Sequence, residues 1–225
     1  MDGNGRWAER HGKNRALGHK AGIKGVRELI RTANDIGVRY LTIYSFSTEN
    51  WSRPATEVKT LMALFAKTLS TELDALHEEQ VRIRTIGDLG PLPKATREVF
   101  EAAAERTAAN PGMTLIIAVN YGSRTEIVDA AKLLARRALD GELDARQIDA
   151  LSPADFSALL TTKDFPDPDL LIRTSGEYRI SNFLLFQIAY SEIYITQALW
   201  PDFDKYELLR AMLSYQGRQR RYGGV

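Results

Sequence analysis

The first seven residues, MDGNGRW, combine three groups that together suit a metal-bound anion. Asp2 supplies a carboxylate, residues 3–5 supply a flexible, glycine-rich backbone, and Arg6 supplies a guanidinium. The N–H groups of such a turn can cradle an anion, and a neighbouring carboxylate can hold Mg²⁺. The segment lacks the Walker A and dinucleotide-binding patterns, and Arg6 and Trp7 stand where an EF-hand loop needs an oxygen ligand and a glycine. A turn without a ligand is the alternative interpretation.

Two further clusters carry cations. Arg15 and His19 lie four residues apart, just ahead of a predicted helix, and a basic pair opposes the helix dipole there unless an anion binds. In RTSGEYRIS, Arg173 and Arg179 lie near serine hydroxyls, a set of donors that suits a diphosphate. Surface arginines beside helix-capping serines are the alternative interpretation of this second cluster.

Polar and aromatic residues also gather in the segment SFSTENWSRP, namely Ser47, Glu49, Asn50, Trp51 and Arg53. Its asparagine can hold a substrate or a water, its tryptophan offers an apolar face, and its arginine can reach an anion. The alternative is a turn that leads into a helix. Glu192, in AYSEIYIT, is a candidate second oxygen ligand for a metal, although an isolated carboxylate is more often a surface group.

The apolar pattern predicts the elements that hold these clusters. Helices are expected over 21–37, 55–80, 92–110, 123–141 and 202–221, and strands over 38–46, 81–87, 113–122, 169–174 and 191–197. Residues 142–169 are the least regular. Alternating strands and helices predict a single α/β domain over 1–225, with a central, mainly parallel sheet flanked by helices. Ligands bind at the carboxyl ends of such strands, where the polar segments 45–54, 120–124 and 173–182 fall.

Composition narrows the functional classes. The chain has 225 residues, 44% of them hydrophobic, with 30 basic and 29 acidic side chains and no cysteine. Thiolate chemistry and disulfides are therefore excluded, and the near-zero net charge gives no reason to expect a nucleic-acid partner. No apolar run approaches the roughly 20 residues of a membrane span. We expect a cytoplasmic protein that is able to touch the inner membrane surface as a peripheral protein.

Five ordered motifs, MDGNGRW, SFSTENWSRP, NYGSR, DLLIRTSGEYRISNFLLFQIAYSE and LWPDF, resemble those of the cis-prenyltransferase family over nearly the whole chain. The resemblance implies a Mg²⁺-dependent transferase that condenses isopentenyl diphosphate repeatedly onto an allylic diphosphate, usually farnesyl diphosphate, and forms cis double bonds. It favours undecaprenyl diphosphate as the product, which is delivered to the membrane as a peptidoglycan precursor carrier. The product length, the primer and the general base stay open.

The resemblance also implies a role for each matching residue. Asp2 would hold Mg²⁺ and be the main catalytic residue, and Glu192 would assist the metal. Asn50, with Ser47, would position isopentenyl diphosphate or relay its proton. The allylic diphosphate would bind Gly3, Asn4, Gly5, Arg6, Arg15 and His19. The diphosphate of isopentenyl diphosphate would bind Arg173, Arg179 and Ser181. Neighbouring substrate-binding positions are Trp7, Glu49, Trp51 and Arg53.

Further expectations concern the rest of the chain. The apolar helix stripe of Val58, Leu61, Met62, Phe65, Leu69, Leu73 and Leu76 would be partly core and partly the wall of a tunnel beside the sheet. Met113 would lie near the tunnel floor. The resemblance implies a homodimer in which the segment Arg221–Gly223 reaches the partner's site. Members of the family also have a strand immediately before MDGNGRW, and this sequence lacks that strand. We therefore expect the natural protein to start earlier.

Three alternatives to this prediction are open. The chain could be a cis-prenyltransferase of different product length, or a non-catalytic partner subunit, although such subunits lose the motif that contains Asp2 and Arg6. An enzyme that binds nucleotide phosphates is a third alternative, against which the missing Walker motif counts. There is no DD pair of the kind that trans-prenyltransferases use. Tyr178 departs from the His or Gln that relatives often carry, and it is given no metal role.

Overall fold

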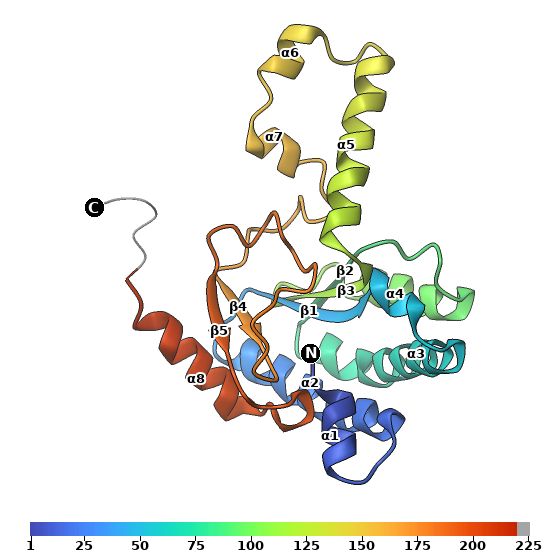
Figure 1. Ribbon diagram of the computed structural model, residues 1–225, viewed down its shortest axis with the longest axis vertical. Helices are drawn as coiled ribbons and strands as arrows, with labels where there is room; N and C mark the ends of the chain where they lie inside the picture. Colours follow the sequence, from blue (N-terminus) through green and yellow to red (C-terminus); the bar gives the residue numbers. More distant parts are fainter. Residues whose placement is uncertain (220–225) are drawn as a thin grey trace.

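The computed structural model describes residues 1–219, and in it strands alternate with helices as predicted (Figure 1). The strands are β1 (Tyr40–Ser47), β2 (Arg82–Ile86), β3 (Thr114–Tyr121), β4 (Leu170–Arg173) and β5 (Glu192–Ile195). All strand pairs are parallel, and they form two sheets in the described residues, one in the order β1-β3-β2 and one of β4 with β5. The α/β class and the parallel arrangement are confirmed.

The helices flank these sheets. They are α1 (Asn4–Arg10), α2 (Arg15–Asp35), α3 (Ala55–Glu78), α4 (Lys94–Arg106), α5 (Ser123–Leu139), α6 (Ala145–Asp149), α7 (Pro153–Ser157) and α8 (Lys205–Gln216), with short 3₁₀ helices η1 (Thr48–Ser52) and η2 (Trp200–Asp202). Helix α5 projects away from the sheets, and α6 and α7 lie beside it on the same side of the molecule (Figure 1). None of the helices in residues 1–219 has both the length and the apolar character that crossing a membrane requires.

Two predictions near the N-terminus were wrong. Residues 4–10 form helix α1 instead of a turn, and Gly3 precedes the helix with a φ of 106°. Helix α2 begins at Arg15 instead of residue 21, because the Asn14 side chain caps it by accepting a hydrogen bond from the Leu17 N–H at 3.0 Å. Several glycines at the start of α2 lower its helix propensity and conceal this start in the sequence. The closing helix is also shorter than predicted, since it begins at Lys205.

Glycines bring α1 and α2 into backbone contact. A Cβ atom built on Gly18 would lie 2.0 Å from the carbonyl oxygen of Asn4. A Cβ atom on Gly22 would lie 2.4 Å from Asn4 Oδ1 and 2.7 Å from Cδ1 of Trp200. A side chain at residue 18 would require the α1 backbone to shift, and one at residue 22 would require the Asn4 side chain and the Trp200 ring to move. The two glycines therefore fix the place of the N-terminal segment that carries Asp2.

The core lies around β3, whose residues are all buried because it is the middle strand and lies between layers of helices. The buried residues of α3 are Val58, Leu61, Met62, Leu69 and Leu76, which confirms the predicted apolar face. Met113 is buried in the same cluster and does not line the cavity described below, so the expected position near a tunnel floor is not observed.

A cavity of about 390 Å³ separates the two sheets. It is lined by residues 38–44 along β1 and by residues 170–174 along β4, and Met1 lies at its edge. Within residues 1–219, β1 pairs with β3 and β4 pairs with β5, so the edges that face this cavity lack a strand partner. Unpaired parallel edges of this kind are a template for one further strand.

A buried carboxylate ties α5 to the segments that follow it. Glu126 accepts hydrogen bonds from the Tyr121 hydroxyl at 2.6 Å, from the Thr161 N–H at 3.0 Å and from Gln187 Nε2 at 3.0 Å, and it also pairs with the Thr161 hydroxyl. Burial, with the hydrogen bond to Glu126 adding to it, raises the pKa of the Tyr121 phenol. This network joins three segments that are distant in the sequence.

Replacing Glu126 by alanine is expected to lower the free energy of unfolding by about 2–4 kcal/mol, because several buried donors lose their acceptor. Urea unfolding followed by circular dichroism measures the change. Asp129→Ala is the matched control, since Asp129 is also on α5 but forms an exposed ion pair with Lys132 at 3.0 Å. That variant should change stability by less than about 1 kcal/mol. Equal effects of the two substitutions would contradict the structural role of Glu126.

Candidate active site

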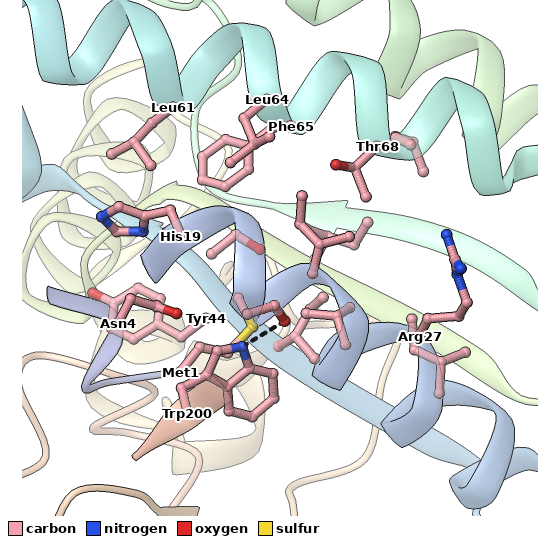
Figure 2. A pocket seen from close by; sticks show the side chains of 18 of the residues that line it. Met1, Asn4, His19, Arg27, Tyr44, Leu61, Leu64, Phe65, Thr68 and Trp200 are labelled. Carbon is pink, nitrogen blue, oxygen red and sulfur yellow. Dashed lines mark hydrogen bonds between the residues drawn. The ribbon is translucent and has the colours of Figure 1, made fainter. Parts of the chain in front are cut away.

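A cavity of about 340 Å³ lies between α2 and α3 and reaches the carboxyl ends of β1 and β4. Figure 2 shows it from close by, with polar side chains at one end and apolar side chains from α3 along one wall. The structure brings together nine of the predicted site residues in its lining, namely Asp2, Asn4, His19, Ser47, Asn50, Arg53, Arg173, Arg179 and Ser181. The predicted polar segments 45–54 and 173–182 therefore meet at one edge of the strands, whereas no residue of the third predicted segment, 120–124, lines the cavity.

Asp2 is held rigidly at this edge. Its N–H donates to Thr174 Oγ1 at 3.0 Å, and its carbonyl oxygen accepts from the Trp200 N–H at 2.9 Å. Its carboxylate accepts from the Gly3 N–H at 2.7 Å and from Arg173 Nη2 at 2.8 Å. Burial acts to raise the pKa of this carboxyl, but Arg173 and Arg6 outweigh it, so the pKa lies below the usual 3.8. Asp2 is therefore an anion at neutral pH.

Three guanidiniums surround this carboxylate. Arg6 Nη2 lies 3.3 Å and Arg179 Nη2 lies 3.9 Å from Asp2 Oδ2, in addition to the bond from Arg173. Glu177 bridges two of the cations, at 2.6 Å from Arg6 and 2.5 Å from Arg179. Three positive charges face two carboxylates, which leaves a local excess of positive charge. Glu177 was not among the predicted site residues, although its place between two arginines in RTSGEYRIS was an available signal.

Within residues 1–219, three buried polar atoms in the cavity lining lack a hydrogen-bond partner: Asn4 Oδ1, His19 Nε2 and Arg173 Nε. Buried polar groups normally have a partner, because an unpaired one costs free energy. All three lie at the end of the cavity that holds Asp2, and the first two appear together in Figure 2. Such a set of unpaired groups is typical of a site that receives a polar ligand.

The loop after β1 divides into residues that line the cavity and residues that hold the loop. The Ser47 N–H donates to Asn50 Oδ1 at 3.1 Å, and both residues line the cavity. Trp51 Nε1 instead donates to Asn120 Oδ1 at 2.8 Å, and Glu49 accepts from Asn182 Nδ2 at 2.7 Å. The Trp51 and Glu49 side chains therefore fix the loop to neighbouring segments, and neither of them lines the cavity.

Several other predicted site residues lie outside the lining. Trp7 Nε1 donates to Asp202 Oδ1 at 2.7 Å, and its ring stacks on His11. The Arg15 guanidinium lies against Gly5, since a Cβ atom there would be 3.2 Å from Arg15 Nε. These residues support α1 around the cavity. Their predicted contacts with substrate, like those of Gly3 and Arg6, stay predictions.

Glu192 lies apart from Asp2. It is the first residue of β5, paired in register with Leu170, whereas the Asp2 end of the sheet is reached at Arg173 and Ile195. Three residues along a strand correspond to about 10 Å. The Glu192 carboxylate instead pairs with Arg218 at 2.6 Å. The structure therefore does not bring these two predicted metal ligands together, and a metal role for Glu192 stays a prediction.

The donor set limits how a metal could be held. No group of three or more His, Asp or Glu side chains converges anywhere in residues 1–219. Asp2 is a single carboxylate, and three arginines accompany it. Mg²⁺ commonly uses one or two carboxylates, several waters and substrate phosphate oxygens. The residues present therefore fit a Mg²⁺ ion that arrives with, and is shared with, a diphosphate.

The imidazole of His19 is expected to titrate below its ordinary pKa of 6.5. Burial makes the largest contribution to the lowered pKa and Arg53 lowers it further, while Glu57 acts to raise it. The unfolded chain then binds this proton more readily than the folded chain, so His19 should reduce stability as the pH falls below 6.5. NMR titration of the imidazole signals, assigned with a His19→Gln variant, measures this shift. A midpoint at or above 6.5 would contradict the partly buried position of His19 beside Arg53.

Away from the Asp2 end most of the lining is apolar, and the charged side chains there are Arg27, Arg31, Glu72 and Glu79. Ile23, Val26 and Ile30 line it from α2, and Leu61, Leu64, Phe65 and Leu69 line it from α3. Figure 2 shows three of the α3 residues side by side along the wall. Of the predicted stripe, Leu61, Phe65, Leu69 and Leu76 line the cavity, while Val58 and Met62 pack in the core without lining it. The apolar face of α3 therefore forms part of the core and part of the cavity wall. The contribution of α2 to the cavity wall was not predicted.

Comparisons with known proteins agree with this geometry. Residues 1–223 match the model of a family described as "Putative undecaprenyl diphosphate synthase". An isoprenyl transferase of Prochlorococcus marinus is 51% identical over all 225 residues, which cover 84% of that relative. The isoprenyl transferase of Heliobacterium mobile is also 51% identical over the whole chain and is covered to 85%.

Solved structures give the same result. A lavandulyl diphosphate synthase from Lavandula x intermedia, in complex with dimethylallyl diphosphate, superposes with a TM-score of 0.95 at 36% identity, over 99% of this chain and 95% of that one. A probable undecaprenyl diphosphate synthase from Campylobacter jejuni gives 0.78 at 31% identity, over 91% and 92%. The chain belongs to the undecaprenyl diphosphate synthase family, and it is a transferase of the cis-prenyltransferase class.

Proposed function

We propose that this enzyme condenses isopentenyl diphosphate repeatedly onto an allylic diphosphate, with farnesyl diphosphate as the primer and undecaprenyl diphosphate as the product. The observation that carries the proposal is the pairing of a cationic end and an apolar body in one cavity. Of the three unpaired buried atoms at the cationic end, Arg173 Nε can donate to a phosphate oxygen, and so can His19 Nε2 in the tautomer that carries its proton there, whereas Asn4 Oδ1 is an acceptor. A solved relative of 36% identity is described in complex with dimethylallyl diphosphate, which supports a prenyl diphosphate as substrate.

In the proposed reaction the C–O bond of the allylic diphosphate breaks, the isopentenyl double bond attacks the allylic carbon, and a proton leaves the new chain. Arg6, Arg173 and Arg179 would bind the diphosphates and stabilise the charge that develops on the leaving group. Mg²⁺, when bound at Asp2, would neutralise further phosphate charge. The apolar wall would exclude water from the allylic cation, and Asn50 would orient the acceptor or relay its proton.

The direct experiment incubates the protein with Mg²⁺, farnesyl diphosphate and labelled isopentenyl diphosphate and separates the lipid products by length. We expect a ladder of cis-elongated products that ends near eleven isoprene units. A ladder that ends at another length would support the proposed condensation reaction and contradict undecaprenyl diphosphate as its product. Since one solved relative is a lavandulyl diphosphate synthase, a parallel reaction contains dimethylallyl diphosphate alone. Product in that reaction, with no elongation ladder in the first, would contradict the proposal.

We also propose that the enzyme is a cytoplasmic homodimer that delivers its product to the membrane. Exposed apolar side chains of Ile193 on β5 and Leu213 on α8, two elements that contact each other, support an interface with a second copy. Sedimentation velocity would test the oligomeric state. The expected contribution of residues 221–223 to the partner's site lies outside the described residues.

We also propose that a strand precedes MDGNGRW in the natural protein, as the family resemblance implies. The cavity between β1 and β4, with an unpaired parallel edge on each side and Met1 beside it, supports a strand that would join the two sheets. A chain extended upstream should then melt at a higher temperature than residues 1–225. Equal melting temperatures would count against this strand.

A further inference from the structure

The residues proposed to bind isopentenyl diphosphate come from two different sheets. Ser47 ends β1, and Asn50 lies in η1 directly after it. Arg179 and Ser181 follow β4, and all four residues line the main cavity. Within residues 1–219, β1 and β4 do not pair with each other, and a cavity separates their sheets. Contacts outside the strands must therefore hold these two parts of the site at a fixed distance from each other.

Asn182 makes contacts of this kind. It comes directly after Ser181, and it does not itself line the cavity. Its Nδ2 donates to Glu49 Oε1 at 2.7 Å, and Glu49 comes directly before Asn50. Its Oδ1 accepts from the Arg124 N–H at 2.8 Å. One side chain therefore joins the segment after β4 to η1 and to the first turn of α5.

The backbone around Asn182 fits this role. Ser181, Asn182 and Leu184 have φ values of 55°, 61° and 50°, in the left-handed region that residues other than glycine seldom adopt. Asparagine tolerates this region better than most residues, and such conformations persist where the surroundings determine them. The Asn182 carbonyl oxygen also accepts from the Ser123 N–H at 2.9 Å. Contacts with the start of α5 therefore hold the segment that carries Ser181.

The junction between these segments is closely packed and includes a charge. A Cβ atom built on Gly122 would lie 2.4 Å from Thr48 Oγ1 and 2.9 Å from Asn182 Nδ2. Burial acts to raise the pKa of the Glu49 carboxyl, but hydrogen bonds, foremost the one from Asn182, lower the pKa below the usual 4.5. The Asn182 amide therefore donates to an anion at neutral pH, which strengthens the hydrogen bond.

We propose that Asn182 is a positioning residue for isopentenyl diphosphate, because it fixes Asn50 on η1 relative to Ser181 on the segment after β4. The inference rests on the proposed function, in which these two residues bind the same substrate. Without the bond to Glu49, η1 can move relative to Ser181, and binding of isopentenyl diphosphate weakens. The allylic diphosphate is assigned to residues before and on α1 and α2, which Asn182 does not contact, so its binding should not change.

The primary test breaks this hydrogen bond and then re-forms it in the opposite direction. Asn182→Asp keeps the size of the side chain and an acceptor for the Arg124 N–H, but it places a second carboxylate against Glu49. KM for isopentenyl diphosphate should rise about tenfold, through one lost hydrogen bond and a new repulsion, while KM for farnesyl diphosphate stays within about twofold. The double variant Asn182→Asp/Glu49→Gln has the amide on residue 49 and the carboxylate on residue 182. It should restore KM for isopentenyl diphosphate to within about twofold of the wild type.

A pair of glycine variants provides the matched control. Asn182→Gly keeps a left-handed backbone accessible and removes both side-chain hydrogen bonds, so KM for isopentenyl diphosphate should rise about fivefold or more. Gln80, between α3 and β2, also has a left-handed φ, of 59°, and its side chain donates to the His77 carbonyl oxygen at 3.2 Å. It does not line the cavity. Gln80→Gly should therefore leave both KM values unchanged.

A second measurement does not depend on turnover. Calorimetric titration with isopentenyl diphosphate alone gives its Kd for each variant. The Kd should rise about tenfold in Asn182→Asp and return towards the wild-type value in the double variant Asn182→Asp/Glu49→Gln. Urea unfolding of the same samples shows that they are folded.

The outcomes separate the two proposals. Unchanged KM and Kd for isopentenyl diphosphate in Asn182→Asp would overturn the positioning role. Failure of the double variant to restore these values, an equal increase in KM for both substrates, or the same increase in Gln80→Gly would also overturn it. Absence of condensation by the wild type, together with the expected pattern of Kd values, would contradict the proposed function and leave the positioning role supported. Absence of isopentenyl diphosphate binding to the wild type would overturn the positioning role as well.

Discussion

The Asp2→Ala variant is expected to lose Mg²⁺-dependent turnover by about 10³-fold in kcat/KM, the upper range for removal of one preorganised electrostatic group. Within residues 1–219, Asp2 is the only carboxylate that lines the cationic end of the cavity, and Glu177 pairs with the arginines from outside the lining. Loss of Asp2 removes the oxygen ligand that would hold Mg²⁺ against the diphosphate. Steady-state incorporation of labelled isopentenyl diphosphate measures the effect.

A binding measurement shows whether this loss is electrostatic. Removing the Asp2 charge leaves Arg6, Arg173 and Arg179 less neutralised, so inorganic diphosphate without Mg²⁺ should bind the variant at least as tightly as the wild type. Asp202→Ala is the control for a loosened N-terminal segment, because Asp202 holds Trp7. That control should keep turnover within about tenfold of the wild type. Similar losses in both variants would assign the effect to folding and not to the carboxylate.

The Gly18→Ala variant is expected to lower the free energy of unfolding by about 1–3 kcal/mol, although alanine is the better helix former. The added Cβ would lie 2.0 Å from the carbonyl oxygen of Asn4 and 2.8 Å from its carbonyl carbon. Backbone atoms cannot turn aside as a flexible side chain can, so α1 must move. Because α1 follows directly after Asp2, KM for the allylic diphosphate should rise as well.

The same helix supplies a matched control for this prediction. A Cβ on Gly25 would have its nearest contact at 3.4 Å, from the carbonyl oxygen of Trp200, which is an ordinary contact distance. Gly25→Ala should therefore be neutral or stabilise the protein by up to about 1 kcal/mol through helix propensity. Urea midpoints of the two variants measure the difference. Equal midpoints would show that α1 and α2 are not in the close contact described here.

The identity of the local elements could be predicted from the sequence because it depends on short-range patterns. The apolar residues of α3 recur at helical spacing, and the β-branched run of β3 has the character of a buried strand, so both were located to within a few residues. Gly37, with a φ of 80°, ended the predicted helix α2 at the correct turn. The polar segments were placed at the carboxyl ends of strands by the same rules.

The N-terminal helices show where local rules fail. Glycine lowers helix propensity, so the start of α2 at Arg15 and the whole of α1 were missed. In the folded protein the same glycines permit the close approach of α1 to α2, and tertiary packing outweighs their propensity. A property that weakens the helix signal in the sequence is thus the property that the fold requires.

The sequence by itself determined which residue types are available for chemistry: one early carboxylate, several arginines and a long apolar helix face. Only the tertiary structure decided which of them meet, because Asp2 is held by Thr174 and Arg173, more than 170 residues away along the chain. It also decided that Glu177 joins two of the arginines and that Trp7 and Trp51 support the site without lining it. Such contacts depend on burial and distance between remote segments, and these are properties of the packed chain that no local pattern contains.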